Sequence, residues 1–397
     1  MIKMLIDSDY QTLKKMANPI KKPFVICDLD VLKTNLERVG EDLRKKNKKM
    51  RLCTKSVRVP EIVKYAEEQD FINGLFNYNS AEALFYAQEY RIRDILIGYP
   101  IMSELDAEEA CKAASYENVE ITVIVDNTHH VDLLEKYCNK NGVHLKLLVE
   151  LDVSYRFFGM HLGVLRSPLR TPDDVISLAR YIDDSNNVSF RGIMGYEAQN
   201  ASVGDNKFLY RWLKKRSREF VNEHRATVVN ELEREGFECE VVNGGGSGCY
   251  QETASEEVIT EIGIGSLLFK SHIFDSIHSL NHFDPSLFFV LEIVRKPKND
   301  VTTAFSGGYT SSGSDPAIPK PVIPHNIKTI KFEEFGEVQT PFKFNPDHIH
   351  LHLGDPIFCR FGKAGEPLEH FNEVNIFEDG KITGTYKTYR GLGKRFS

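Results

Sequence analysis

The sequence predicts an α/β protein in two parts: a (β/α)8 barrel of the TIM type, followed by an all-β C-terminal domain. In the first part, short apolar runs alternate with amphipathic, helix-like segments, which is the order of elements in a closed parallel barrel. From about residue 283 onward, the runs alternate apolar and polar residues between Gly, Pro and Ser clusters, as antiparallel strands do. A chain of 397 residues is long enough for both parts.

Eight apolar runs, bounded by turn residues and nearly uniform in hydrophobicity, are the predicted barrel strands. They lie at 51–55, 72–77, 94–99, 120–126, 145–151, 189–195, 239–243 and 260–267. Segments with helical spacing lie between them, at 60–69, 80–89, 103–114 and 129–139. Pro60 and Ser80 suit the first positions of two of these helices. A doubly wound open sheet has the same alternation, so the number of runs alone does not prove a barrel.

The change of pattern also predicts the division into domains. We expect residues 25–282 to form the barrel domain and 283–397 the β domain, with residues 1–24 as an extension that packs on the β domain. Predicted strands of the β domain lie at 287–294, 300–305, 327–332 and 349–361, and a hairpin at 376–389 turns at Asp379-Gly380. The Gly-, Ser- and Pro-rich stretch 307–324 is expected to be a functional loop or a flexible connector.

Charge and composition argue against two classes of partner. Lys and Arg number 50 against 57 Asp and Glu, a formal net charge of −7, and no basic cluster is present to neutralise the phosphates of a nucleic acid. No run approaches the roughly 18–20 consecutive apolar residues of a membrane span, and the N-terminus lacks the apolar core of a signal peptide. The seven cysteines contain no CxxC pair and read as reduced thiols, which predicts a cytoplasmic location.

Two glycine-rich turns follow the last two predicted barrel strands, NGGGSG at 243–248 and GIGS at 263–266. In a (β/α)8 barrel a phosphate often binds after strands 7 and 8, where backbone N–H groups and serine hydroxyls donate to its oxygens. One such turn alone is more often a tight βα connection, but two in these places favour a phosphate site. The expected binding residues are Gly244, Gly245, Gly246, Ser247, Gly265 and Ser266.

Lys55 ends the first predicted barrel strand, in the run RLCTK. A lysine in a barrel mouth can lose its proton through desolvation and form a Schiff base, although a lone lysine at a strand end is more often simply exposed. A lysine on one side and a phosphate site on the other suit pyridoxal 5′-phosphate (PLP), whose aldehyde and phosphate need separate anchors.

Recognisable motifs extend over nearly the whole chain from about Pro23. They are RLCTKSVR (51–58), HLGVLRSP (161–168), MGYEAQ (194–199), VGD (203–205), NGGGSG (243–248), GIGSLLF (263–269), GGYTSSG (307–313), GEVQTP (336–341), KAGE (363–366) and EHFNE (369–373). With them the chain resembles the PLP-dependent proteins of fold type III, with an alanine-racemase-type barrel and a D-serine-dehydratase-like C-terminal domain. Within that group it is similar to proteins called amino acid deaminase/aldolase, which are related to D-threonine aldolase.

The resemblance implies that Lys55 carries PLP as a Schiff base and that Tyr196 lies near the pyridine nitrogen. Relatives often have an arginine near the cofactor's O3′, in a pattern like RxGV. The equivalent place here holds His161, with Arg156 five residues earlier, and the sequence leaves open which of them reaches O3′. Without the resemblance, Tyr196 reads as a packed aromatic residue and Arg156 as a surface residue.

Relatives in this group also bind a divalent metal through a His-x-Cys or His-x-Asp pair after a Gly-Asp turn. This chain has the turn, Gly354-Asp355, but no such pair follows it. Three histidines at 348, 350 and 352 alternate with period two and would line one face of a strand, for which a solvated face is the favoured interpretation. No metal ligand is predicted, and a divalent metal is not favoured.

The leading hypothesis is a PLP-dependent lyase for small D-β-hydroxy amino acids, of the D-threonine aldolase or D-serine dehydratase type. The alternative enzyme is an amino acid racemase, for which Tyr309, Tyr386 or Tyr389 could serve as a second base. A non-catalytic PLP carrier and a sugar-phosphate-binding barrel without PLP are the other interpretations. By the resemblance we expect a homodimer with an amino acid substrate, and neither nucleic acid nor membrane as a partner.

Overall fold

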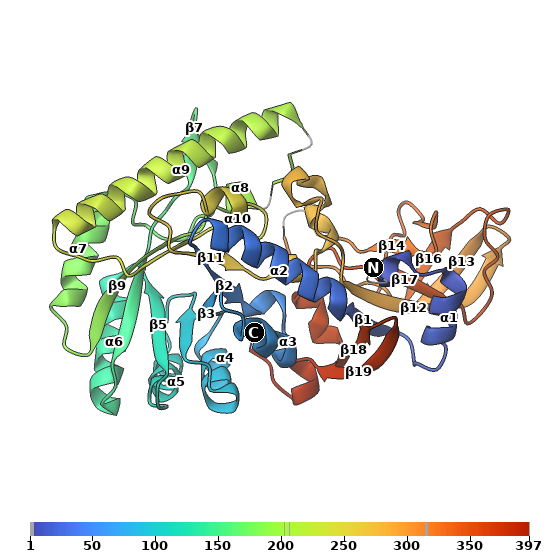
Figure 1. Ribbon diagram of the computed structural model, residues 1–397, viewed down its shortest axis with the longest axis horizontal. Helices are drawn as coiled ribbons and strands as arrows, with labels where there is room; N and C mark the ends of the chain where they lie inside the picture. Colours follow the sequence, from blue (N-terminus) through green and yellow to red (C-terminus); the bar gives the residue numbers. More distant parts are fainter. Residues whose placement is uncertain (1–3, 202, 206, 314–316, 397) are drawn as a thin grey trace. The chain divides into compact units, whose positions relative to one another are not determined.

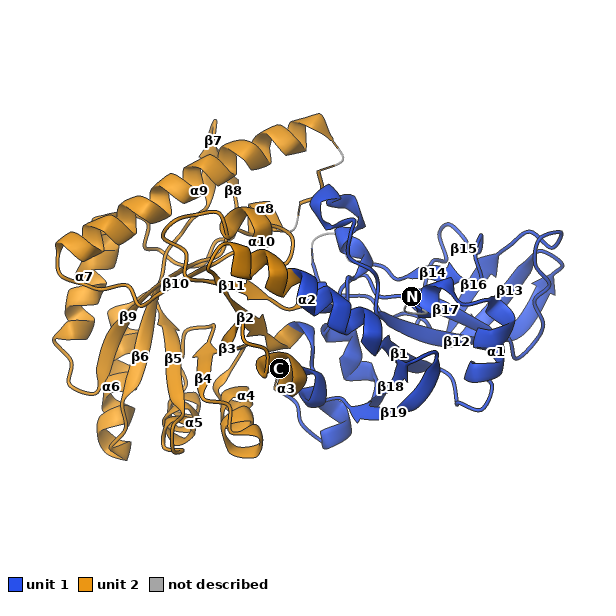
Figure 2. Ribbon diagram, viewed as in Figure 1, with its two compact units in different colours: residues 1–38, 56–62, 266–395 blue, residues 39–55, 63–265, 396–397 orange. Residues whose placement is uncertain are grey.

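The computed structural model describes residues 4–201, 203–205, 207–313 and 317–396, so that part of the predicted 307–324 loop lies outside the described residues. The chain forms two compact units (Figure 2). The barrel unit comprises residues 39–55, 63–265 and 396–397, and the sheet unit comprises residues 1–38, 56–62 and 266–395. The barrel unit contains a closed parallel barrel and the sheet unit a nine-stranded sheet, which confirms the predicted fold class.

Eight parallel strands close the barrel in the order β10-β11-β2-β3-β4-β5-β6-β9 (Figure 1). Their bounds are β2 Lys49–Cys53, β3 Ile72–Asn77, β4 Asp94–Ile97, β5 Glu120–Val125, β6 Leu145–Glu150, β9 Val188–Gly195, β10 Val241–Gly244 and β11 Glu261–Ile264. Each overlaps one of the eight apolar runs, so all eight predicted strands are confirmed. Gly244 of β10 lies opposite Gly195 of β9, where the ring of strands closes.

Helices alternate with the barrel strands. They are α2 Leu29–Lys45, α3 Pro60–Glu67, α4 Ser80–Phe85, α5 Glu104–Ala114, α6 Thr128–Asn141, α7 Pro172–Asp183, α8 Ala198–Ala201, α9 Phe208–Arg234 and α10 Tyr250–Thr253. Pro60 and Ser80 open helices as predicted. The side chain of Asn79 caps α4 by accepting the backbone N–H of Glu82 at 2.8 Å. Such caps fix where each helix starts and therefore where the preceding strand must end.

The barrel interior is layered. Near the strand starts, Asp94 of β4 lies 2.6 Å from Arg51 of β2 and 2.9 Å from Arg191 of β9. Since none of these strands are neighbours, the contacts cross the interior. Above them lies an apolar cluster of Phe76, Leu96, Ile124, Leu148, Met194 and Val241. Because side chains alternate along a strand, residues two positions beyond this cluster also point inward, into the mouth of the barrel.

The sheet unit is built on β1 Phe24–Asp28, β12 Leu287–Lys298, β13 Val301–Phe305, β14 Lys320–Ile323, β15 Lys328–Thr329, β16 Gln339–Lys343, β17 Pro356–Arg360, β18 Glu373–Glu378 and β19 Lys381–Lys387. Its main order is β15-β16-β13-β12-β1-β18-β19. Although its residues fall within the range expected for the barrel domain, β1 lies in this sheet, antiparallel to β12 and parallel to β18. All five residues of β1 are buried, as befits a central strand.

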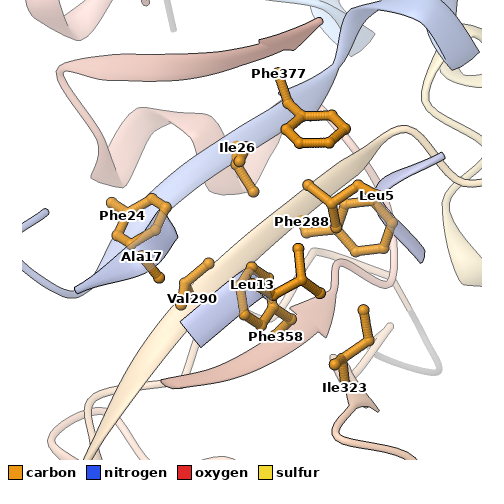
Figure 3. Packing of buried hydrophobic residues seen from close by; sticks show 10 residues of the cluster. All are labelled: Leu5, Leu13, Ala17, Phe24, Ile26, Phe288, Val290, Ile323, Phe358 and Phe377. Carbon is orange, nitrogen blue, oxygen red and sulfur yellow. The ribbon is translucent and has the colours of Figure 1, made fainter. Parts of the chain in front are cut away.

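The N-terminal segment packs on this sheet. Leu5, Leu13 and Ala17, the last two in α1 (Tyr10–Ala17), are fully buried in one apolar cluster (Figure 3). The sheet side chains of that cluster are Phe24, Ile26, Phe288, Val290, Ile323, Phe358 and Phe377. The extension therefore supplies part of the core of the sheet unit.

Two strand predictions in this region need correction and one is confirmed. The predicted strand at 349–361 begins only at Pro356, so His348, His350 and His352 lie exposed in turns and loops and line no strand face. The predicted strand at 327–332 is reduced to Lys328–Thr329. Gly354 and Asp355 favour a turn in the first segment, and in the second the chain turns at Phe332, which has a φ of +77°. The predicted hairpin is present as β18 and β19, with positive φ angles at Asp379 and Gly380.

Candidate active site

Lys55 lies just beyond β2, in a single 3₁₀ turn over Thr54–Ser56. Its Nζ donates to the hydroxyl of Tyr99 at 3.1 Å. Burial lowers the pKa of Lys55, but Tyr99, Cys53 and Tyr196 raise it by more, and the resulting pKa lies above the ordinary value. Neighbouring hydroxyl and thiol groups therefore favour the ammonium form of Lys55, against the loss of the proton that desolvation alone would cause.

Three polar side chains occupy inward positions directly above the apolar cluster. They are Asp126 after β5, Glu150 at the end of β6 and Tyr196 after β9, each two residues beyond a member of that cluster. In a (β/α)8 barrel this C-terminal end of the strands is where active sites form. The sequence analysis identified Tyr196 but neither carboxylate, since their place became evident only with the register of the strands.

Glu150 is 6% exposed and lies in an unusual electrostatic setting. Burial raises its pKa to about 7, against the opposing effect of Arg166. The nearby carboxylates Asp126 and Asp152 raise the pKa further. A carboxyl group with a pKa near neutrality can both accept and donate a proton, which is what acid–base chemistry at this mouth would require.

Arg166 is the arginine that lies beside Tyr196, with its guanidinium carbon 5.2 Å from the centre of the tyrosine ring. The two residues considered for O3′ lie elsewhere, opposite each other on a hairpin of β7 (Tyr155–Phe157) and β8 (Met160–Leu162). Arg156 is exposed there, and the buried Nε2 of His161 has no hydrogen-bond partner among the described residues. Arg156 and His161 lie on this extra hairpin, whereas Arg166 follows it. Spacing along the sequence therefore did not identify Arg166.

The first glycine-rich turn leaves β10 at Gly244 and is buried throughout. Gly245 has a φ of +77°, and a Cβ there would approach Ile262 to 2.6 Å. At Gly246 a Cβ would lie 3.0 Å from that of Ala201. In the described part of the chain, no acceptor binds the backbone N–H groups of residues 246–248. The turn thus offers a row of donors suited to phosphate oxygens.

The second glycine-rich turn follows β11 and reaches Gly265 in the barrel unit. Ser266 is the first residue of the following segment of the sheet unit and opens a 3₁₀ turn. Its hydroxyl donates to that of Ser56 at 2.9 Å, and Ser56 is the residue after Lys55. A phosphate-binding role for Gly265 and Ser266 stays a prediction.

These residues fit PLP. Lys55 supplies a primary amine at the end of a barrel strand, and the close-packed turn at Gly245 and Gly246 leaves donors for a phosphate. Tyr196 and Arg166 add a hydroxyl, an aromatic face and a positive charge in the same unit. Within the described ranges, no group of three or more His, Cys, Asp or Glu side chains could hold a metal ion, and no helix is long and apolar enough to cross a bilayer.

Residues 27–272 match the family model of the alanine racemase N-terminal domain. The chain is 23% identical to a 3-hydroxy-D-aspartate aldolase of Paracoccus denitrificans (strain Pd 1222) over 328 residues, 81% of this chain and 80% of the relative. Among solved structures it is similar to a D-threonine aldolase from Filomicrobium marinum, with a TM-score of 0.82 at 18% identity over 94% of this chain and 96% of that one. A D-threo-3-hydroxyaspartate dehydratase from Delftia sp. HT23 has a TM-score of 0.73 at 14% identity, over 94% and 98% of the two chains.

Proposed function

We propose that this chain, which belongs to the family of the alanine racemase N-terminal domain, is a PLP-dependent lyase that acts on small D-configured β-hydroxy amino acids. The observation that carries the proposal is the amine of Lys55 at the barrel mouth, in the same unit as the donor-rich turn at 246–248. Aldol cleavage is our first choice of reaction, because the curated relative that covers 81% of the chain is named as an aldolase.

Lys55 would hold PLP by a carbon–nitrogen double bond, and residues 246–248 would bind its phosphate through backbone N–H groups. When bound, PLP supplies an electron-accepting ring that stabilises negative charge at the substrate's Cα. Tyr196 would adjoin that ring, and Arg166 would place a positive charge beside it. The cofactor-binding and catalytic roles of these residues are proposals, and Arg166 takes the role that the sequence analysis left open between Arg156 and His161.

Glu150 would move the proton that the reaction requires at the β-hydroxyl. In aldol cleavage its ionised carboxylate accepts the hydroxyl proton, the oxygen's electron pair forms the carbonyl, and the Cα–Cβ pair stays with Cα. A proton from the Lys55 ammonium then completes the amino acid product. The protonated form of Glu150 would instead assist departure of hydroxide, and its pKa near 7 is the observation that favours dehydration as a second candidate.

A racemase receives less support. Tyr309 is buried, and its hydroxyl lies 2.9 Å from that of Ser306. Tyr389 is also fully buried, so neither phenol is exposed to a substrate in the sheet unit. Tyr386 is half-buried on β19 and has no feature that marks it as a base.

The test is product analysis of the PLP-loaded protein with D-threonine, 3-hydroxy-D-aspartate and D-serine. Aldol cleavage of D-threonine releases glycine and acetaldehyde, dehydration releases a 2-oxo acid and ammonia, and racemisation yields the L enantiomer. Lys55→Ala should abolish both the visible absorption of bound PLP and all turnover. Lys64→Ala, an exposed lysine on α3, is the matched control and should retain both. Full activity in Lys55→Ala would refute the assignment.

We also propose a cytoplasmic homodimer. The seven cysteines, all free, support a reducing compartment, and the family resemblance supports dimers. Light scattering on the purified chain and fractionation of cells that express it test the two statements separately.

A further inference from the structure

A buried charge network lies directly behind the first glycine-rich turn. Glu197, the residue after Tyr196, is 1% exposed, and Arg225 of α9 is fully buried. Nη2 of Arg225 lies 3.0 Å from Oε2 of Glu197 and 3.0 Å from the carbonyl oxygen of Gly195. The other guanidinium nitrogen, Nη1, pairs with Glu256. All of these groups belong to the barrel unit.

Glu197 is also bonded to the turn itself. Its Oε2 accepts the backbone N–H of Gly245 at 2.9 Å, and its Oε1 accepts the hydroxyl of Thr253 at 2.6 Å. Gly245 begins the turn, and Thr253 lies in α10, the helix that ends it. One carboxylate therefore ties both ends of the segment together, while the N–H groups of residues 246–248 remain without an acceptor among the described residues.

Arg225 explains Gly244, which the sequence analysis attributed to phosphate binding alone. A Cβ at Gly244 would lie 2.7 Å from Nη2 of Arg225, and Gly244 pairs with Gly195, whose carbonyl accepts from the same nitrogen. The absence of a side chain at Gly244 leaves room for the guanidinium. The glycines of this motif therefore have different roles. Gly244 makes room for Arg225, whereas Gly245 and Gly246 allow the close-packed turn that carries the donors.

Stability alone is a weak explanation for this network of buried charges. A buried ion pair must offset the cost of removing both charges from water and often adds little net stability. Two carboxylates face one guanidinium here, and burial raises the pKa of Glu256, which favours its neutral form.

We infer that Glu197 and Arg225 are positioning residues that hold the glycine-rich turn in the conformation that binds the cofactor's phosphate. This inference rests on the proposed function. Glu197 occupies the N–H of Gly245, which leaves the next three N–H groups, without an acceptor among the described residues, as the donors of the turn. Arg225 orients the carboxylate of Glu197 through a direct hydrogen bond and fixes the end of β9 at the same time.

The test compares two aldehydes that differ only in the phosphate. Dissociation constants of PLP and pyridoxal are measured from the visible absorption of the lysine-bound form in the wild type and in Glu197→Gln. We expect PLP to bind at least about tenfold more weakly to the variant, since the buried turn loses a charged partner. Pyridoxal binding should stay unchanged, because pyridoxal makes no phosphate contact.

Asp94→Asn is the matched control, because Asp94 is a carboxylate paired with Arg51 and Arg191 near the strand starts, away from the glycine-rich turn. It should lower the melting temperature and leave the affinities for PLP and pyridoxal unchanged. If Glu197→Gln does not fold, Thr253→Val removes one hydrogen bond to Oε1 and should cause a smaller loss, again confined to PLP.

Equal weakening of PLP and pyridoxal binding in Glu197→Gln, or an equal weakening of PLP binding in Asp94→Asn, would overturn the inference, since the network would then be merely structural. If the wild type forms no coloured species with either aldehyde, the proposed function fails instead. Inorganic phosphate still tests the inference in that case: it should raise the melting temperature of the wild type but not of Glu197→Gln.

Discussion

The proton affinity of Glu150 leads to a prediction that needs no cofactor. The pKa of this carboxyl rises from an ordinary value of 4.5 to about 7 in the folded protein. A tenfold change in proton affinity corresponds to about 1.4 kcal/mol, so the ionised form destabilises the fold by about 3 kcal/mol. The folded state binds the proton of Glu150 more tightly than the unfolded state does. The stability that this proton contributes is therefore complete below pH 4.5 and is lost as the pH rises to about 7.

Glu150→Gln removes the titration and keeps the shape. The free energy of unfolding of the variant, relative to the wild type, should therefore increase by about 3 kcal/mol between pH 4.5 and pH 8. Urea unfolding at several pH values measures this difference, with the barrel followed by a probe attached to one of its helices. The exposed Glu257→Gln is the control and should follow the wild type at every pH. Parallel curves for Glu150→Gln and the wild type would refute the assignment of a raised pKa.

Two further predictions concern the groups around Glu150 and Lys55. Arg166→Met should raise the pKa of Glu150, since Arg166 lowers it, and should reduce turnover by roughly 10–100-fold. Arg156→Met is the control: Arg156 lies on the exposed hairpin, and its replacement should change neither the pKa of Glu150 nor turnover. The pH–activity profile and kcat separate these variants, and the reverse order of effects would assign the site to Arg156. The rate at which PLP combines with Lys55 should rise with pH, because the raised pKa of the lysine keeps it protonated at neutrality and only the free amine attacks an aldehyde. Tyr99→Phe should shift that rise to lower pH, and an unchanged profile would show that the Tyr99 hydroxyl does not control the proton.

The barrel could be predicted from the sequence because its strands are buried on both faces. Each strand then appears as a short, continuous apolar run, and each of the eight predicted runs overlaps a strand of the barrel. The predicted domain boundary at residue 25 did not separate β1 from the barrel, since β1 is a central strand of the second sheet and no strand was predicted there. Composition alone does not tell which sheet a five-residue run joins, because that choice depends on partners far along the chain, such as β12 and β18.

The candidate site was predictable in part. Lys55 and the glycine-rich turn stand out by residue type and place, and Tyr196 was identified only through the family resemblance. Glu150 and Asp126 resemble many other acidic residues that follow apolar runs. Their inward direction depends on the register of β5 and β6, which a one-residue slip would reverse. Arg166 was missed because the β7-β8 hairpin inserts residues between the strand end and the arginine.

The two ends of the barrel interior show how charged residues of similar type differ in use. At the strand starts, burial would raise the pKa of Asp94, but Arg51 and Arg191 lower it by more, so that the carboxylate stays ionised and paired. At the mouth, burial prevails over Arg166 and Glu150 keeps a proton near neutrality. A group whose partners neutralise it fully can only contribute to stability. A buried carboxyl group that is partly ionised near pH 7 lowers the stability of the fold. Such a loss of stability is expected at a site where a proton must move. The direction of the pKa change therefore fits a structural role for the carboxylate at one end of the barrel and supports the chemistry proposed at the other, although both ends use carboxylates and arginines.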